Sequence, residues 1–223
     1  MKIVAVVPAK GVSQRLENKN LYKINGATLI ERACQKLLAS KYIDAVYLDS
    51  ESEAIKMHCE HLFSKGLKFI KRPKELATNE TGANEMMIYG LHAIEECDLL
   101  IQTFATSPMI TLETIDNCIE NFLKEGSDYD SFFTVTKMQE YFWDDQNNPI
   151  NFDTTELPNS FELPPYFMET HGLYGIFTKS LLKTKTRVGS KPMLIEVPKI
   201  ESLDVNDKED LAMVELLLTS IEK

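Results

Sequence analysis

The sequence predicts an α/β fold in which helices cover a mainly parallel sheet. Three observations support this class: short apolar segments alternate with amphipathic ones, the first apolar segment at residues 2–7 is continuous, and the longer segments repeat their apolar positions at helical spacing. A continuous apolar strand is expected where both faces of a parallel sheet are covered. Hydrophobic residues make up 43% of the 223 residues, so a chain of this length can bury a sizeable core.

The regular alternation occupies roughly the first 136 residues. Residues 8–20 form a polar loop after the first strand, and Thr28 is placed to cap the next helix, because its hydroxyl can accept a backbone N–H. Cys59 shares an apolar helix face with Ile55 and Leu62, so we expect it in the core. Strands are predicted at residues 2–7, 43–48, 67–70, 98–104 and 131–136, and helices at 29–38, 52–64, 82–96 and from 111 or 113 onward.

Residues 139–165 interrupt the alternation. They are rich in proline and lack a sustained hydrophobic period, which is typical of a functional segment or an interface arm. Order returns with predicted strands at 173–177 and 193–197 and predicted helices at 179–185 and 208–222. We therefore predict a single domain over residues 1–223 with an irregular excursion at about 139–165.

Charge and cysteine content narrow the classes of partner. The 24 Lys and Arg residues are outnumbered by 34 Asp and Glu residues, and the net charge of −10 repels nucleic acid and anionic membranes. We therefore expect no nucleic acid and no membrane as partners. The opening apolar run is far shorter than the roughly 20 residues of a membrane span. The four cysteines form no C-x-x-C pair, so we expect a cytoplasmic protein without a zinc site.

The loop from Pro8 to Asn20 is the strongest candidate for a phosphate site. Lys10, Arg15 and Lys19 follow directly on a predicted strand, at the edge where open α/β sheets bind ligands. Backbone amides and point charges in such a loop can contact different phosphate oxygens. The loop has neither the P-loop spacing nor G-x-G-x-x-G. On these residues alone, a solvated loop with ordinary surface lysines explains the pattern equally well.

Five short motifs occur in the same order as in a known family. In the first, Pro8, Ala9, Ser13, Lys19 and Asn20 match positions of the family motif P-A-R-x-G-S-K-x-x-P-x-K-N. Residues 72–77 (RPKELA) resemble R-P-x-x-L-A, and residues 105–108 (ATSP) resemble Q-P-T-S-P. Residues 170–174 (THGLY) resemble N-G-A-x-Y, and residues 203–210 (LDVNDKED) resemble D-I-D-x-x-x-D. The chain therefore resembles the CMP-sugar synthetases, the acylneuraminate cytidylyltransferase family, and is similar to the CMP-N-acetylneuraminate synthetases. The common order of the motifs carries the resemblance, since no single motif is decisive.

The resemblance implies a three-layer, Rossmann-like nucleotide-diphospho-sugar transferase fold. It implies an enzyme that transfers CMP from CTP to the anomeric hydroxyl of an acidic 2-keto sugar, such as a sialic or related nonulosonic acid, and releases pyrophosphate. Lys19 and Asp204 would be catalytic, and Mg²⁺ would be the cofactor, bound by Asp204 and Asn206. The nucleotide would contact Ala9, Lys10, Gly11, Ser13, Arg15, Lys19, Asn20, Arg72 and Ser107, and the acceptor would contact Phe104, Thr106, His171 and Tyr174. A homodimer is also implied, in which residues 139–165 reach toward the partner or the acceptor.

The chain departs from the family at four positions. Lys10 replaces an arginine, Asn206 replaces the second carboxylate of D-I-D, Phe104 stands at a glutamine that contacts the sugar, and His171 replaces an asparagine. An apolar Phe104 predicts an acceptor with fewer hydroxyls at that point, as in deoxy or diamino nonulosonic acids. Two other functions stay open: a nucleotidyltransferase of the same fold with another base or acceptor, and a non-catalytic nucleotide-sugar binding module.

Two further charged groups carry expectations. Arg72 precedes a proline at the end of a predicted strand, so we expect it in a loop where it serves the nucleotide and not the fold. Lys183, Lys185 and Arg187 form a basic stretch that we expect to be a solvated face unless it borders the sugar carboxylate.

Overall fold

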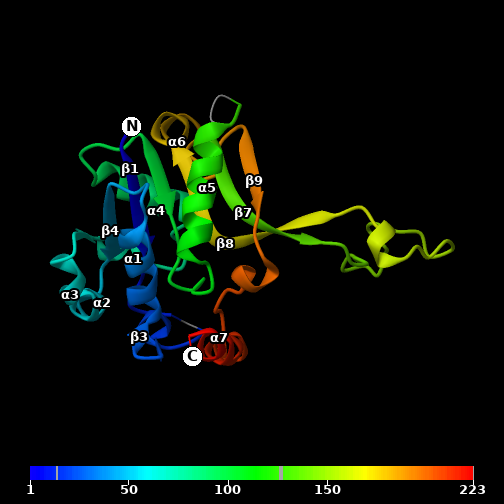
Figure 1. The fold of residues 1–223 in the computed structure, drawn as a ribbon, viewed down its shortest axis with the longest axis horizontal. Helices are drawn as coiled ribbons and strands as arrows, with labels where there is room; N and C mark the ends of the chain where they lie inside the picture. Colours follow the sequence, from blue (N-terminus) through cyan, green and yellow to red (C-terminus); the bar gives the residue numbers. More distant parts are fainter. Residues whose placement is uncertain (14, 126–127, 223) are drawn as a thin grey trace.

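The computed structural model describes residues 1–13, 15–125 and 128–222. Its centre is a seven-stranded sheet with the strand order β5-β4-β1-β6-β8-β7-β9 (Figure 1). The strands are β1 (Ile3–Pro8), β4 (Ala45–Ser50), β5 (Leu67–Lys71), β6 (Leu99–Gln102), β7 (Ser131–Met138), β8 (Tyr166–Phe177) and β9 (Pro192–Glu196). A separate short hairpin joins β2 (Lys23–Ile24) to β3 (Ala27–Thr28). The predicted α/β class is confirmed.

The strands of the central sheet run mainly parallel. β1 pairs in parallel with β4 and β6, β4 with β5, and β7 with β9. β8 is antiparallel to both of its neighbours, β6 and β7. All six residues of β1 are buried, which explains its continuous apolar sequence.

Helices cover both faces of the sheet and give three layers (Figure 1). The helices are α1 (Leu29–Ala39), α2 (Glu53–His58), α3 (Glu60–Phe63), α4 (Ala83–His92), α5 (Leu112–Lys124), α6 (Thr178–Thr184) and α7 (Lys208–Ile221). α1 and α5 share a core with Ile3, Ala5 and Val7, whereas α4 and α6 pack with Val6 on the opposite face. Successive side chains of a strand point to opposite faces, so β1 contributes to both cores. Within the described ranges, none of the helices is long and apolar enough to cross a membrane.

Several predicted boundaries can be compared with the elements. The hydroxyl of Thr28 accepts the N–H of Glu31, and the Glu31 carboxylate accepts the N–H of Thr28, so the predicted cap is confirmed as a capping box. The predicted helix at 52–64 divides at buried Cys59 into α2 and α3. The predicted strand at 173–177 is too short, because β8 already begins at Tyr166.

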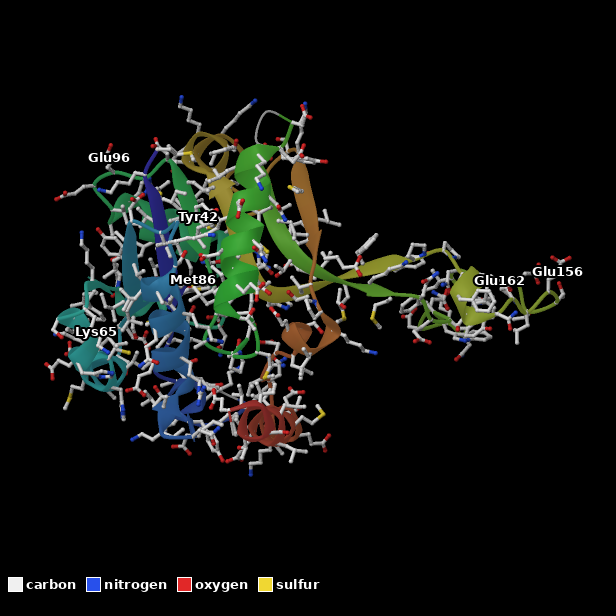
Figure 2. The ribbon with its side chains drawn as sticks, viewed as in Figure 1. Tyr42, Lys65, Met86, Glu96, Glu156 and Glu162 are labelled. Carbon is white, nitrogen blue, oxygen red and sulfur yellow. The ribbon has the colours of Figure 1, made fainter. Side chains whose placement is uncertain are left out.

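β7 and β8 continue beyond the sheet as an arm. Figure 1 shows this arm projecting from the body of the molecule, with residues 139–165 at its outer end. Glu156 and Glu162 lie at the tip of the arm, far from the helices of the body (Figure 2). Residues 139–165 contain one short 3-10 helix, Ser160–Glu162, and are otherwise irregular, as the sequence predicted.

Candidate active site

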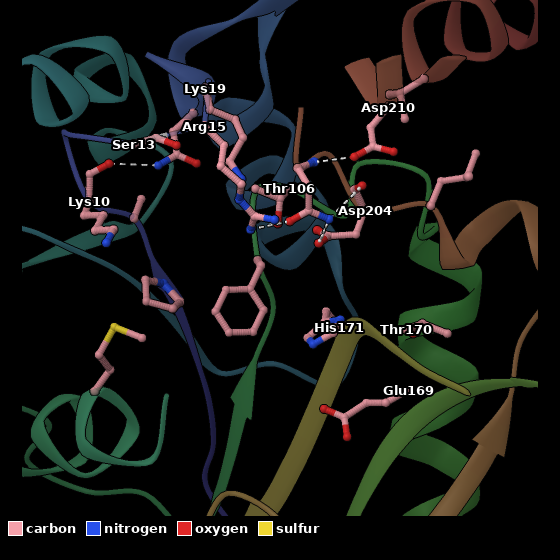
Figure 3. A pocket seen from close by; sticks show the side chains of 18 of the residues that line it. Lys10, Ser13, Arg15, Lys19, Thr106, Glu169, Thr170, His171, Asp204 and Asp210 are labelled. Carbon is pink, nitrogen blue, oxygen red and sulfur yellow. Dashed lines mark hydrogen bonds between the residues drawn. The ribbon is translucent and has the colours of Figure 1, made fainter. Parts of the chain in front are cut away.

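A cavity of about 1050 Å³ opens at the edge of the sheet where β1, β5 and β6 end. This is the edge at which open α/β sheets bind ligands. Figure 3 shows Lys10 and Ser13 on one side of the cavity and His171 and Glu169 on the other. The cavity brings together twelve predicted site residues: Ala9, Lys10, Ser13, Arg15, Lys19, Asn20, Arg72, Phe104, Thr106, His171, Asp204 and Asn206.

Hydrogen bonds within the loop after β1, and one to Glu51 outside it, fix the shape of this loop. The side-chain amide of Asn20 donates to the carbonyl of Lys10 at 3.0 Å. Gly11 packs so closely that a Cβ added to it would lie 2.7 Å from the Cβ of Ser52, and its N–H donates to the Glu51 carboxylate at 2.7 Å. Gly11 therefore shapes the loop and is not among the described residues that line the cavity, and its contact with the nucleotide stays a prediction.

Lys10 reaches residues that the sequence analysis missed. Its Nζ donates to the side-chain oxygen of Asn79 at 2.5 Å and to the carbonyl of Thr78 at 3.4 Å. Both residues lie in the connection before α4, which carried no recognisable ligand motif. The other lining residues that sequence reasoning missed include Thr81, Met86, Met168, Glu169, Lys199 and Asp210.

Lys19 is half-buried between the first loop and the closing motif at residues 203–210. Its Nζ donates to the carbonyl of Val205 at 2.8 Å, and the Val205 N–H donates to the carbonyl of Thr106 at 2.7 Å. Burial lowers the pKa of Lys19, and the nearby Asp204 carboxylate opposes this shift. An anion that enters the cavity therefore meets a partly desolvated cation.

Asp204, Asn206 and Arg15 form a chain of hydrogen bonds. The Asn206 amide donates to Asp204 Oδ2 at 2.9 Å, and Arg15 donates to the Asn206 amide oxygen at 2.7 Å. Asp204 Oδ1 is buried and has no hydrogen-bond partner in the described part of the chain. A buried oxygen without a partner is costly, and a hard cation with its waters would satisfy it. Asp204 therefore fits a Mg²⁺ ligand better than Asn206, whose oxygen is engaged by Arg15.

The metal-ligating side chains are sparse. Among residues 1–13, 15–125 and 128–222, no three His, Cys, Asp or Glu side chains are grouped so that they could hold a metal ion together. Mg²⁺ in nucleotide sites usually takes one or two carboxylates and completes its shell with phosphate oxygens and water. A single carboxylate oxygen at the cavity is compatible with that chemistry.

Arg72 pairs with Asp49 at the end of β4. Its Nη2 donates to Asp49 Oδ2 at 2.8 Å and to the Asp49 carbonyl at 3.0 Å, and its Nε lies 3.1 and 3.2 Å from the two carboxylate oxygens. The two side chains are 1% and 0% exposed. Burial raises the pKa of Asp49, and the guanidinium of Arg72 opposes that rise. Arg72 lines the cavity, but the expectation that it does not serve the fold is wrong, because it joins β4 to the end of β5.

The chain turns after β6 and brings Phe104 and Thr106 into the cavity. The Ser107 N–H donates to the Phe104 carbonyl at 3.1 Å, and Ser107 is buried behind this turn. Ser107 is not among the described residues that line the cavity, and its contact with the nucleotide stays a prediction. The edge of the Phe104 ring meets Tyr174, with 6.2 Å between the ring centroids.

A bulge in β8 presents His171 at the cavity. The pairing of β7 with β8 changes register around Thr134. The Thr134 hydroxyl bonds the Thr170 hydroxyl at 2.6 Å and accepts the N–H of Leu173 at 3.1 Å. His171 adopts a φ of 56° in this bulge and is exposed. Positive φ is uncommon outside glycine, and bulges beside sites commonly redirect a side chain.

Tyr174 is buried and is not among the described residues that line the cavity, and its contact with the acceptor stays a prediction. Its hydroxyl donates to the carboxylate of Glu169, which does line the cavity. Arg187 donates to the same carboxylate at 2.7 Å, with its guanidinium 4.0 Å above the Tyr174 ring. Arg187 is therefore a paired, largely buried cation and not part of a solvated face.

Cations, an unpaired carboxylate oxygen and an apolar ring at the carboxyl edge of a three-layer sheet characterise an α/β protein built to bind a small anionic ligand. The sequence profile of the cytidylyltransferases matches residues 4–202 of this chain. The chain therefore belongs to the cytidylyltransferase family, and the resemblance stated from its motifs is confirmed.

Individual relatives are distant but cover the chain. An 8-amino-3,8-dideoxy-manno-octulosonate cytidylyltransferase of Shewanella frigidimarina is 22% identical, over 96% of this chain and 90% of that protein. N-acylneuraminate cytidylyltransferase A of Danio rerio is also 22% identical over 96% of this chain, which spans only 50% of that relative. A solved CMP:2-keto-3-deoxy-manno-octonic acid synthetase complexed with CTP superposes with a TM-score of 0.69 at 14% identity, over 99% of both chains. This likeness confirms the Rossmann-like transferase fold.

Proposed function

We propose that this protein transfers CMP from CTP to the anomeric hydroxyl of an acidic 2-keto sugar and releases pyrophosphate. The observation that carries the proposal is one cavity lined by Lys10, Arg15, Lys19 and Asp204, whose Oδ1 is buried without a hydrogen-bond partner in the described part of the chain. Membership of the cytidylyltransferase family supports the reaction class. The names of the relatives, which specify octulosonate and neuraminate acceptors, support an acidic sugar.

The proposed reaction needs positioning and charge neutralisation. The anomeric oxygen forms a bond to the α-phosphorus, the bond from that phosphorus to the bridging oxygen breaks, and pyrophosphate leaves while the hydroxyl proton passes to solvent. No side-chain nucleophile takes part in such a displacement, so the barrier falls through in-line alignment and stabilisation of phosphate charge. Lys10, Arg15 and Lys19 would supply positive charge to the phosphates, and Lys19 also lies within the electrostatic influence of Asp204.

We infer that Asp204 Oδ1 holds Mg²⁺. The support is the buried, unpartnered state of this oxygen and the preference of Mg²⁺ for carboxylates, phosphate oxygens and water. The ion, when bound, would neutralise charge on the triphosphate. Asn206 would then orient the Asp204 carboxylate through its 2.9 Å hydrogen bond and would not itself bind the ion.

We infer that the acceptor carries few hydroxyls beside Phe104. Met86 and Met168 line the same cavity, and these three side chains provide an apolar wall. Such a wall favours a methyl or deoxy carbon, because a buried hydroxyl without a partner is costly. Thr106 and His171 would supply the polar contacts to the sugar. The dideoxy acceptor in the name of the Shewanella relative supports this choice.

We propose that the protein forms a homodimer through its arm. The arm exposes large apolar side chains, among them Trp143 at 53%, Leu157 at 67% and Phe161 at 74%. Exposed apolar groups gathered on a projecting element mark interaction surfaces. A second copy would cover these groups without blocking the cavity edge of the sheet.

A pyrophosphate-release screen tests the proposed function. CTP, ATP, GTP and UTP are each incubated with a panel of ulosonic acids and Mg²⁺, and release is expected with CTP and a ulosonic acid. Release with another nucleotide would favour a nucleotidyltransferase with a different base. Binding without release for every pair would favour a nucleotide-sugar binding module.

A further inference from the structure

We propose that Glu169 is a specificity residue that accepts a hydrogen bond from an amine or hydroxyl of the acceptor sugar. The inference rests on the proposed function, because it names a group that the acceptor presents inside the same cavity. Glu169 lies on β8, two residues before His171, and lines the cavity on the side opposite Lys10 (Figure 3).

Two neighbours fix one oxygen of Glu169 from behind. Oε1 accepts hydrogen bonds from the Tyr174 hydroxyl and from Arg187, the latter at 2.7 Å. Arg187 is itself held, because its guanidinium lies 4.0 Å above the Tyr174 ring and its backbone N–H donates to Asn84 at 2.8 Å. The Tyr174 ring is buried against the edge of Phe104. The carboxylate is therefore held in one orientation before any ligand arrives.

The second oxygen of Glu169 is left for a ligand. No hydrogen bond reaches Oε2 from residues 1–13, 15–125 or 128–222, and the Glu169 side chain is 33% exposed. An ionised carboxylate can accept but cannot donate a hydrogen bond, so its complement is an N–H or O–H group. Met168 and Phe104 line the same cavity with apolar surface, so a donor placed beside them would otherwise lose its partner.

Because Arg187 neutralises its charge, Glu169 is expected to recognise a hydrogen-bond donor rather than a positive charge. The two side chains form a pair without net charge, so long-range attraction of a cation is weakened, whereas the directional hydrogen bond to Oε2 remains. An ammonium group and a hydroxyl can both make that bond. Either group would serve as an N–H or O–H donor on the acceptor sugar, at a carbon other than the one that carries the reacting hydroxyl.

The test uses sets of ulosonic acids that share a skeleton and carry a hydroxyl, an amine or a hydrogen at one carbon in turn. Their binding to the CTP-loaded protein is measured by calorimetry without Mg²⁺, and pyrophosphate release is measured with it. At one carbon, a donor-bearing acid is expected to bind at least about tenfold more tightly than the deoxy acid, as charge-assisted hydrogen bonds allow. Comparison of the affinities of the amine-bearing and hydroxyl-bearing acids identifies which donor the protein prefers.

Glu169→Gln should reduce that tenfold preference to about threefold or less, because its amide oxygen would stay with the donors Tyr174 and Arg187 and its NH2 group, which cannot accept a hydrogen bond, would replace Oε2. CTP affinity should stay unchanged, and Glu156→Gln at the tip of the arm is the matched control. Should Glu169→Gln fold poorly, Glu169→Asp keeps the charge but withdraws the oxygen by one carbon, and it should lose the preference as well.

Two results would overturn the inference. One is a deoxy acid that binds as tightly as both donor-bearing acids at every carbon, and the other is a donor preference that survives in both Glu169 variants. Donor-dependent binding without pyrophosphate release would support Glu169 and reject the proposed reaction. Pyrophosphate release that is equal for all acids would support the reaction and reject Glu169.

Discussion

Arg72→Met is expected to lower the free energy of unfolding by about 3–5 kcal/mol at neutral pH, because it leaves the buried Asp49 carboxylate without its partner. Asp49 is 0% exposed, and both of its carboxylate oxygens accept hydrogen bonds from Arg72. If the orphaned carboxyl takes up a proton instead, reaching pH 7 from its ordinary pKa of 3.8 costs about 4.4 kcal/mol at about 1.36 kcal/mol per pH unit. The two estimates agree, and methionine keeps most of the apolar stem.

The destabilisation should depend on pH in a defined direction. Without Arg72, burial and the nearby Glu51 carboxylate both raise the pKa of Asp49, so its value in the folded state lies further above its value in the unfolded chain. Between these two values the folded state binds the proton more tightly, and stability falls as the pH rises through that window. The variant should therefore approach the wild-type stability near pH 4 and fall furthest below it at pH 7.

Urea unfolding followed by circular dichroism at several pH values measures this effect. The double variant Asp49→Leu/Arg72→Met should recover most of the lost stability, because an apolar pair can replace a buried ion pair at little cost. A single variant within about 1 kcal/mol of wild type at pH 7 would refute the reasoning, since removal of one partner of a buried pair is strongly destabilising. A double variant no more stable than Arg72→Met would refute it as well.

Three further predictions concern the cavity and the arm. Only the protonated form of Lys19 attracts phosphate, and its pKa is lowered from 10.5. As the pH is raised, the KM for CTP should therefore begin to increase before pH 10.5 is reached, and Lys19→Arg should move that increase to higher pH. A pH profile that is identical in the two proteins would exclude Lys19 as the titrating group. Asp204→Ala should be inactive at any Mg²⁺ concentration and should fail to bind Mn²⁺ in a titration; full activity at high Mg²⁺ would show that Asp204 is not a direct ligand. If the proposed dimer forms through the arm, Trp143→Ser combined with Phe161→Ser should convert it to a monomer in sedimentation velocity, and an unchanged dimer would place the interface elsewhere.

The order and type of the secondary structure could be predicted because each signal is local. The apolar run of β1 and the cap at Thr28 depend on residues a few positions apart, and both are found as expected. The direction and length of β8 could not be read in this way. Its first residues, 166–172, are mostly exposed along the arm or irregular at the bulge, so they lack the apolar period of a buried strand.

The residues of the candidate site differ in the same way: some could be predicted from local sequence, and others depend on tertiary contacts. The nucleotide side lies largely in one contiguous loop, so a motif could point to Lys10, Arg15 and Lys19 together. Arg72 was misjudged because its partner Asp49 is 23 residues away, and nothing in the sequence marks that pairing. Glu169 was missed because its exposure at the cavity follows from the register change opposite Thr134, which is a tertiary property of two strands.

The reversed direction of β8 explains how one edge of the sheet can offer two unlike surfaces. β1 and β6 run toward this edge, so the polar loops that follow them meet there and bring Lys19 and Thr106 together. β8 enters the sheet from the arm and runs away from the edge, so residues 169–171 lie there, and Glu169 is held by pairing with Val135 of β7. Side chains on a paired strand lose little further freedom when a ligand binds, whereas loop side chains must be ordered. Glu169, which pairs with Val135 of β7, therefore belongs to the rigid side of the cavity, where discrimination between similar acceptors gains most from fixed geometry.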